Sequence, residues 1–414
     1  MTANMVQGAV GTPPRGWGAL RSHGRVVSGQ LAAQASSSDP FIVHTAEARI
    51  DPAWDDVVEH LSGGDLIQTT RWAATRQRIG IQVHHLRLCA PDGTLLAGGL
   101  IQRRRVLPGV WIGAVPRGPL LFAEKPGLAD RLIQELAAMA RRTGIDLLIV
   151  QPPVGGEHPL DGAMRAAGFR PGGPTLAADA SIRIDLRRSE EEILHSAHTR
   201  RRTHIRNVLR SPLEWRLSDD VATFHALHVA SARRTGFRPI ELAALQAQWD
   251  ILAPAGMCQI IEVRHDGVPI EAEWLTCFAG SVTSKLKGRA YDKGPAVAAL
   301  KVAGTAVLWH AICWARSIGA QYFDLGGFER SAAEAVLRGE KLKADLSPPC
   351  QIKWSFGGEV FLLPQAQFLL TNRLLQPVLS GLVPPLLNDQ RLRRRVQRLR
   401  AWIGGTGLGT GAAT

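Results

Sequence analysis

The sequence has few cysteines and no long apolar run. Its five cysteines, an odd number, show neither CxxC pairs nor metal-ligand spacing, which is typical of free thiols in a reducing compartment. No stretch reaches the ~18 uninterrupted apolar residues of a membrane-spanning helix. Residues 1–40 lack the continuous apolar core of a secretory signal. We therefore expect a cytoplasmic protein whose first 40 residues form a disordered tail.

Several motifs that hold nucleotides or metals are also missing. The chain has no GxxxxGK[ST], HExxH or GxSxG sequence, and no GxGxxG after an apolar strand. Its histidines occur singly or as His84-His85, without metal-ligand spacing. We therefore expect no metal site and no tightly bound cofactor.

Lysine is scarce outside one region of the chain. Only eight of the 49 basic residues are Lys, and seven of these lie between Lys285 and Lys353. Lysine differs from arginine because its ammonium group is flexible and its pKa shifts readily on burial. The concentration of lysines marks this region as the first place to look for a site.

Two apolar segments of that part of the chain each carry one charge. Tyr322–Phe328 and Gln351–Gly358 are each predicted to form a buried strand that enters a glycine turn, and burying a charge is costly unless it is paired or used. Lys353 either stabilises an oxyanion or phosphate, with Phe356 as an apolar wall, or extends its ammonium into water. Asp324 either contacts a ligand or caps its own turn. These alternatives stay open.

The net charge of +13 is concentrated in two clusters. His198–Arg216 carries a net charge of five and Arg391–Arg400 carries six Arg. We expect a helix over 200–210, with its apolar side at Ile205, Val208 and Leu209. Basic patches attract phosphates, nucleic acid or acidic lipid heads, although a solvated helix face is the alternative. The candidate basic patch of this helix consists of Arg200, Arg201, Arg202 and Arg206.

Two further basic features are candidates for substrate binding. Ser284–Asp292 alternates like a strand, so every second side chain shares one face. This strip would hold a phosphate-bearing ligand or face solvent, and consists of Lys285, Lys287, Arg289 and Tyr291. Arg117, between Pro116 and Gly118, would clamp an anion or belong to a plain turn.

Two landmarks recur along the chain at almost the same spacing. The Asp-Gly turns at Gly93 and Gly267 are separated by 174 positions, and the helix-ending Gly144 and Gly319 by 175. Such offsets indicate two copies of one α/β unit, each a mixed sheet with helices on both faces. We expect the first copy over 41–178 and the second over 179–365.

The residues beyond the second copy change in character. A broken apolar run precedes the Arg-rich stretch, so 366–403 is predicted as an amphipathic, basic helical segment. An apolar segment next to a polybasic one suits an anionic membrane surface, whereas packing on the second copy is the alternative. Residues 404–414 are expected to be disordered.

Three motifs resemble the FemAB-like branch of the GNAT acyltransferases, which includes peptidoglycan bridge aminoacyltransferases and BioF2-like acetyltransferase domains. They are the Arg-rich helix at 199–210, Phe323-Asp-Leu-Gly-Gly327 and Ile352-Lys-Trp-Ser-Phe-Gly357. The resemblance covers about residues 41–365. It implies a tandem duplicated GNAT-like fold, with the C-terminal strand returning to the first copy. It also implies that Lys353 lies near the reacting carbonyl or a substrate phosphate.

The leading hypothesis is transfer of an acyl or aminoacyl group, from acyl-CoA or aminoacyl-tRNA, to an amine of a cell-envelope or peptidoglycan precursor. The enzyme would act in the cytoplasm, at the inner face of the membrane. Lys353 would stabilise the oxyanion, and Asp324 or the leaving group would accept the amine proton. One alternative is a CoA-dependent N-acyltransferase on a soluble amine or polysaccharide. Another is a non-catalytic membrane- or RNA-binding protein, because the pyrophosphate loop of ordinary acetyl-CoA N-acetyltransferases is absent.

Overall fold

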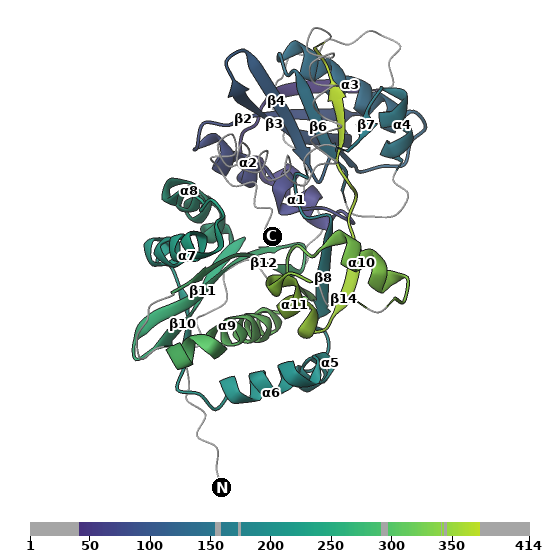
Figure 1. The fold of residues 1–414 in the computed structure, drawn as a ribbon. Coiled ribbons are helices and arrows are strands. Elements are labelled where there is room, and N and C mark those ends of the chain that lie inside the picture. Colours follow the sequence, from purple (N-terminus) through teal and green to yellow (C-terminus); the bar gives the residue numbers. More distant parts are fainter. Residues whose placement is uncertain are drawn as a thin grey trace. The chain divides into compact units, whose positions relative to one another are not determined.

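A computed structural model describes residues 41–153, 159–172, 175–290, 297–340, 342 and 346–372. The chain divides into two compact units (Figure 1). Among the described residues, the N-terminal unit comprises 41–179 together with 363–372, and the C-terminal unit comprises 180–362. Within these ranges no helix combines the length and apolarity needed to cross a bilayer.

The N-terminal unit is built on one mixed sheet with the strand order β1-β2-β3-β4-β6-β15-β7 and a short β5 beside β3. Its strands are β1 (Ile42–Glu47), β2 (Gln82–Cys89), β3 (Leu95–Leu107), β4 (Val110–Pro116), β5 (Leu120–Leu121), β6 (Leu147–Gln151), β7 (Arg170–Pro171) and β15 (Gln367–Leu370). Its helices are α1 (Pro52–His60), η1 (Leu66–Gln68), α2 (Thr70–Gln77), α3 (Leu128–Arg142) and α4 (Leu160–Ala166). Only β4 and β6 pair in parallel among these described strands.

The core of this unit forms where α3 covers the sheet. Leu132, Ile133 and Leu136 recur at helical spacing on α3 and are fully buried. They belong to one apolar cluster with Val115 of β4 and Leu148 of β6. Burial of this stripe explains why the segment is helical and why it covers the parallel pair of strands.

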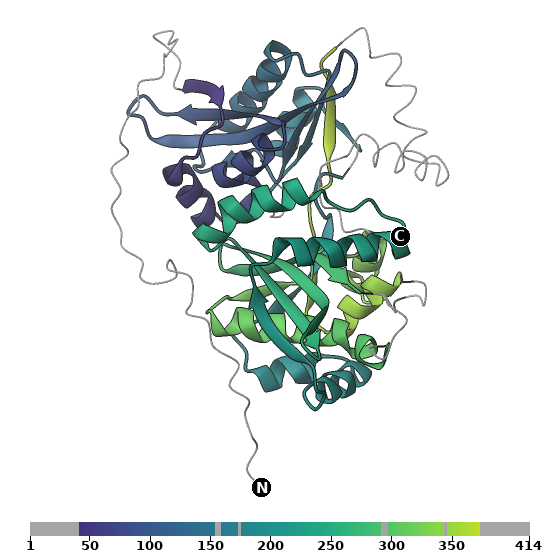
Figure 2. The same cartoon turned by 90° about the vertical axis from the view of Figure 1, so that its left-hand side faces the viewer.

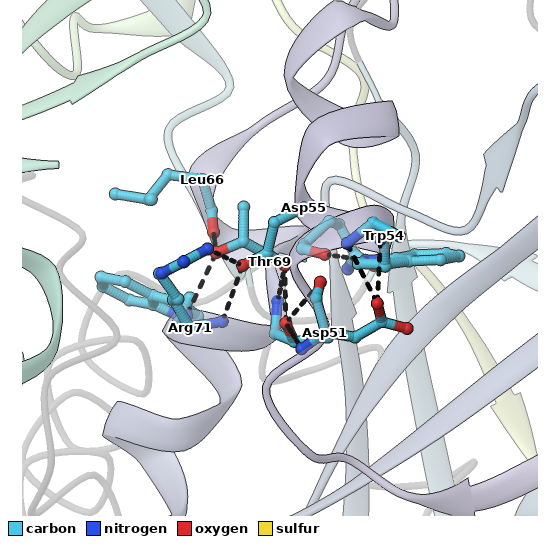
Figure 3. Close-up of polar contacts among 10 residues, drawn as sticks. Asp51, Trp54, Asp55, Leu66, Thr69 and Arg71 are labelled. Carbon is cyan, nitrogen blue, oxygen red and sulfur yellow. Dashed lines mark hydrogen bonds and ion pairs between the residues drawn. The ribbon is translucent and has the colours of Figure 1, made fainter. Parts of the chain in front are cut away.

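A buried carboxylate joins α1 to α2 in the same unit (Figure 3). Asp55 of α1 is 2% exposed and accepts hydrogen bonds from the backbone N–H groups of Thr70 and Arg71, which open α2. The Thr70 hydroxyl and the Arg71 guanidinium donate to it at 2.7 and 2.9 Å. Because both oxygens are occupied, this buried charge is compensated and orients the two helices.

The C-terminal unit has a sheet with the strand order β14-β8-β13-β12-β11-β10-β9. Its strands are β8 (Ala180–Asp185), β9 (Glu214–Ser218), β10 (Cys258–His265), β11 (Val268–Phe278), β12 (Ser281–Arg289), β13 (Tyr322–Asp324) and β14 (Glu359–Leu362). Its helices are α5 (Glu190–Ser196), α6 (Thr199–Val208), α7 (Val221–Thr235), α8 (Leu242–Leu252), η2 (Ala253–Ala255), α9 (Val297–Ser317), α10 (Arg330–Leu337) and α11 (Pro348–Ser355). Here β12 and β13 are the parallel pair.

Helices cover both faces of this second sheet (Figure 1). Trp274 of β11 packs against Phe224 of α7 and Trp249 of α8 on one face. On the other face, Gly304 of α9 lies so close to β11 that a Cβ there would be 3.1 Å from Glu271 Oε1. Residues 271, 273 and 275 of β11 therefore point toward α9, since strand side chains alternate.

The two sheets share one order of elements, which confirms the predicted duplication. In each unit the order of elements is two helices, a β-hairpin, a third antiparallel strand, a long helix and a strand that is parallel to the third. The Asp-Gly turn of the second hairpin has positive φ at both Asp266 and Gly267, as a two-residue turn requires. The predicted mixed α/β fold with flanking helices is thus correct.

The last described strand comes from far along the chain. β15 lies antiparallel to β6, with Gln367 opposite Val150, and runs beside the N-terminal unit's strands in both Figure 1 and Figure 2. The expected return of the C-terminal strand to the first copy is confirmed. The prediction that helical structure begins at residue 366 is wrong for Gln367–Leu370, because this apolar stretch completes a sheet. The rest of the predicted segment, 373–403, lies outside the described residues, as do residues 1–40 and 404–414.

The strand predicted over Gln351–Gly358 is also wrong. This stretch belongs mostly to α11, whose first two positions are Pro348 and Pro349. Proline at the first turn favours a helix start, because its missing N–H has no helical partner there. Strand-like alternation at Ile352, Trp354 and Phe356 concealed this signal.

Candidate active site

Lys353 projects from α11 to the glycines after β13. Its Nζ donates a 2.6 Å hydrogen bond to the carbonyl oxygen of Gly327. The residue as a whole is partly exposed, but its ammonium is desolvated. Burial, reinforced by the Lys287 ammonium, lowers the pKa of Lys353 to about 8. The carboxylates of Glu273 and Asp324 act in the opposite direction.

Asp324 ends the buried strand β13, as predicted, and its carboxylate supports the turn that follows. Its Oδ1 accepts a 2.8 Å hydrogen bond from Gly326 N and a hydrogen bond from Ser181 Oγ. The hydrogen bond from Gly326 N closes an Asx turn, so Asp324 caps its own turn, which is the second of its two predicted roles. Asp324 therefore shapes the loop that presents the Gly327 carbonyl to Lys353.

Gly326 has a conformational and a steric reason to be glycine. Its φ is +74°, in the left-handed region that side chains disfavour. A Cβ would lie 2.6 Å from the carbonyl oxygen of Ser284 and 3.8 Å from Lys353 Nζ. The loop after β13 thus passes in direct contact with β12 at the position of the lysine.

Two buried glutamates face α9 from β11. Glu271 is 4% exposed and Glu273 is fully buried. Desolvation raises the pKa of both carboxyls, that of Glu271 to about 7. The Oε2 atoms of Glu271 and Glu273 accept no hydrogen bond from the part of the chain that the structure describes. A carboxyl with a pKa near 7 and a free acceptor atom is suited to proton transfer.

The predicted basic strip of β12 faces these glutamates rather than solvent alone. Lys287 Nζ lies 3.6 Å from Glu273 Oε2, and Arg289 Nε lies 3.6 Å from Glu271 Oε2. Their Cα atoms are direct cross-strand partners. Both basic side chains are about one-third exposed. Both cations lower the pKa of the neighbouring carboxyl, but burial has the larger effect and raises it.

A β-bulge changes the expected alternation of the strip at Lys285. Leu286 is opposite Trp274 and Ser284 is opposite Leu275, so Lys285 has no partner position on β11. The bulge directs Ser284 toward Glu273, to which its Oγ donates a hydrogen bond. The strict alternation from which Lys285 was predicted to share the face of Lys287 and Arg289 is therefore interrupted at this residue. Tyr291, the fourth member, lies outside the described residues.

The Arg-rich helix is confirmed as α6, but its arginines have different environments. Arg201 turns inward, where it donates to Ser355 Oγ at 2.8 Å and to Thr305 Oγ1, and lies over the ring of Phe356 at 4.9 Å. Arg202 donates to backbone carbonyls before the helix, while Arg200 and Arg206 point outward.

Leu209, predicted on the apolar side of the helix, is instead 58% exposed because α6 ends at Val208.

Two other predicted substrate contacts lie in the protein interior. Phe356 is 1% exposed and belongs to the apolar core of its unit. Arg117 is 4% exposed, donates to the carbonyl of Ala178 and lies 3.6 Å from an Asp65 oxygen. Arg117 is therefore held inside the N-terminal unit rather than presented to an anion.

The site residues gather where the parallel strands separate. β12 pairs with β13 only at Ser281–Thr283, although it continues to Arg289. Ser284, Glu273, Lys287 and Lys353 cluster just beyond the last paired residues. Within the described ranges, no group of three His, Cys, Asp or Glu side chains is placed to bind a metal. The cluster combines a desolvated ammonium group with nearby carboxylates. This arrangement suits acyl transfer.

Sequence reasoning did not single out Glu271, Glu273 or Ser284. A signal was present, because Ile270-Glu-Ala-Glu-Trp274 places two acids on one face of an otherwise apolar strand. Buried acids at alternate strand positions need partners, and the alternate bases of the next strand supply them.

The fold of the chain is similar to that of known proteins. Residues 183–335 match the model of the "Acetyltransferase (GNAT) domain" family. Residues 183–335 are thus similar to a GNAT acetyltransferase domain, and the two units together have the fold of tandem GNAT structures.

Among solved structures, the crystal structure of FemX is similar to it with a TM-score of 0.65 at 14% identity, covering 81% of this chain and 100% of that one. A tandem GNAT protein from the clavulanic acid biosynthesis pathway gives a TM-score of 0.51 at 9% identity, covering 80% and 99%. No curated protein sequence matches the chain.

Proposed function

We propose that the protein transfers an acyl or aminoacyl group to a primary amine, with Lys353 stabilising the reacting carbonyl. The observation that carries the proposal is the buried Lys353 ammonium, held 2.6 Å from the Gly327 carbonyl where β12 and β13 stop pairing. A desolvated cation at this point would bind an oxyanion more strongly than a hydrated one.

In the proposed reaction the neutral amine nitrogen attacks the carbonyl carbon of the donor. A C–N bond forms while the carbonyl electrons move onto oxygen, where the Lys353 ammonium stabilises the charge. The oxyanion then collapses, the C–S or C–O bond of the donor breaks, and the leaving group departs. Asp324 Oδ1 is occupied by two hydrogen bonds, which favours the leaving group as acceptor of the amine proton.

For the donor we propose acyl-CoA, with aminoacyl-tRNA as the alternative. Both donors are polyanions, and the outward-facing Arg200 and Arg206 of α6 are available to contact phosphates. Lys287 and Arg289 contribute less, because each already lies 3.6 Å from a buried glutamate.

For the acceptor we propose an amine of a cell-envelope precursor such as one for peptidoglycan. Support comes from the FemAB-like motifs and the similarity to the FemX structure. A soluble amine or an amino polysaccharide is the second candidate. Docking at the inner membrane surface through 366–403 is part of the first candidate, although most of that segment lies outside the described residues.

The experiment combines each donor with each class of acceptor and follows the product by mass spectrometry. Acetyl-CoA and a mixture of charged tRNAs serve as donors, while a muropeptide precursor, a polyamine and a glucosamine oligomer serve as acceptors. An acyl-amide product with the muropeptide precursor is expected. Product with only the polyamine or the oligomer selects the second candidate, and no product with any pair contradicts the proposed function.

A further inference from the structure

The N-terminal unit contains an open hollow of about 240 Å³ whose lining is rich in arginine. It lies between the turn that follows α2 and the hairpin formed by β3 and β4. Three consecutive residues of β3, Arg103, Arg104 and Arg105, contribute to the lining, and no Asp or Glu of the described ranges does. A concave surface with three cations and no acid attracts anions.

The hollow forms because β3 extends beyond the start of β2. Arg103 pairs with Gln82, the first residue of β2, so Arg104 and Arg105 pair with β4 alone among the described strands. The turn before β2 does not fill the space that remains, since a Cβ at Gly80 would meet no atom of the described structure within 4 Å. The end of β3 therefore carries its arginines beside open space.

Arg103 is held in one position by its neighbours. Its guanidinium lies over the Trp111 ring, 3.5 Å from the centroid, and donates a 2.5 Å hydrogen bond to Gln82 Oε1. A guanidinium fixed in this way loses little freedom when it binds a ligand. Its Nε is buried and makes no hydrogen bond within the described structure. A buried N–H without an acceptor is costly, and an anionic oxygen is a strong acceptor for it.

The one carboxylate that acts on Arg103 does not line the hollow. Asp146 favours the charged form of Arg103, while burial, the larger effect, lowers the pKa of the guanidinium. Asp146 Oδ2 accepts a 2.8 Å hydrogen bond from Trp111 N, and its Oδ1 accepts one of 2.7 Å from Asn372 Nδ2. Both oxygens of this carboxylate are therefore already used in the interior of the unit, and the charge of the hollow is left to an external anion.

We propose that this hollow binds a phosphate group, carried by a small soluble molecule or by a lipid. Guanidinium groups pair with phosphate through parallel hydrogen bonds, and three of them suit an anion with several oxygens that point in different directions. Ile79 and Trp111 line the same hollow and supply apolar surface for the organic part of the ligand. The alternative is that the three charges only protect the end of the sheet from pairing with another chain, which predicts no saturable binding.

The proposal goes beyond the proposed function, because Lys353 belongs to the other unit and the test follows binding alone. The test uses full-length protein labelled with 5-fluorotryptophan and followed by 19F NMR. The chain has 11 Trp, and the signal that disappears in Trp111→Phe identifies the ring beneath Arg103. Glycerol 3-phosphate should shift this signal along a saturable curve, whereas sodium chloride at equal ionic strength should not. A Trp111 signal that phosphate leaves unmoved would overturn the proposal.

The Arg105→Gln variant tests whether the arginines carry the binding. Arg105 is exposed, so the variant should stay folded while its Kd for glycerol 3-phosphate rises about tenfold, as expected for the loss of one charge-assisted contact. The matched control is the double variant Arg165→Gln with Arg170→Gln, which removes two exposed charges from α4 and β7 of the same unit. It should bind like the wild type. An unchanged Kd in Arg105→Gln, or an equal loss in the control, would contradict the site.

Sedimentation with vesicles distinguishes the two sources of the phosphate. If a lipid carries it, Arg105→Gln should bind phosphatidylglycerol vesicles less than the double control variant does, and glycerol 3-phosphate should compete with them. If a soluble molecule carries it, the two variants should bind these vesicles equally. Either result, together with a saturable Trp111 signal, supports the site and assigns its source.

Discussion

At the scale of single residues, the C-terminal unit keeps acids and bases together in its interior. Glu271 and Glu273 alternate on β11, and Arg289 and Lys287 face them from β12. Removing one member of such a pair costs more than the pair contributes, because the partner is left charged and desolvated. These residues therefore constrain one another.

Glu271 gives a pH dependence of stability that is opposite to that of an ordinary carboxylate. Burial raises its pKa to about 7, so between pH 4.5 and 7 the folded protein binds more protons there than the unfolded chain. The Glu271 contribution to the unfolding free energy is then complete below pH 4.5 and is lost as the pH rises through 7. We expect Glu271→Gln to remove this loss, so urea unfolding of the two proteins should diverge from pH 5 to pH 8, with the variant gaining. A constant difference across that range would contradict the assignment.

At the scale of elements, polar contacts fix how helices meet. Arg201 joins α6 to α9 and α11 through Thr305 and Ser355, and Asp55 joins α1 to the first turn of α2. In both cases a single charged side chain, buried for Asp55 and half-buried for Arg201, accepts or donates several hydrogen bonds. Replacing it leaves more than one group unsatisfied.

The Asp55→Ala variant should lower the unfolding free energy by about 3 kcal/mol, since it removes a buried charge from four donors. Asp56→Ala is the matched control, because Asp56 is the next residue of α1 and its side chain is about 71% exposed. We expect that control to change stability by less than about 0.5 kcal/mol. Equal losses in the two variants, measured by urea denaturation, would rule out the role given to Asp55.

Element prediction succeeded where apolar periodicity was simple and failed where two patterns competed. The helix around Ile205 and the strand ending at Asp324 were predicted correctly. The stretch around Lys353 alternates like a strand, yet two prolines start a helix there. The partners of Lys353 come from β11, β12 and the loop after β13, so their convergence depends on tertiary structure. The pattern of residues in one sequence does not show which of these elements lie close together in space.

At the scale of the whole molecule, the first and the last described residues belong to the same unit, the N-terminal one. β15 lies between β6 and β7, and Gln151 is held by bonds to Ala177 and Pro364 from separate stretches of chain. The sheet of the N-terminal unit is therefore complete only when the chain extends to residue 370. The duplication could be predicted from the sequence, because two landmarks recur at offsets of 174 and 175 residues. Strand β15 could not, because its short apolar run is compatible with a helix as well as with a strand.

Ending the chain after residue 362 should unfold the N-terminal unit, since the β6 edge loses its partner. Ending it after residue 372 keeps β15 and every described contact of that strand, and is the matched control. Limited proteolysis should cut the shorter protein within residues 41–179 and leave the control intact there. Equal resistance of both proteins would show that β15 is dispensable.

The central claim is that a charged, buried Lys353 stabilises the reacting carbonyl, and the pH dependence of kcat/KM tests it most directly. With the donor and acceptor pair that gives product, wild-type kcat/KM should fall above about pH 8 as the lysine loses its proton. Lys353→Met should lower kcat by about 100-fold to 1,000-fold and abolish that limb while the protein stays folded. Near-normal turnover in Lys353→Met, or an alkaline limb that persists in it, would contradict the account.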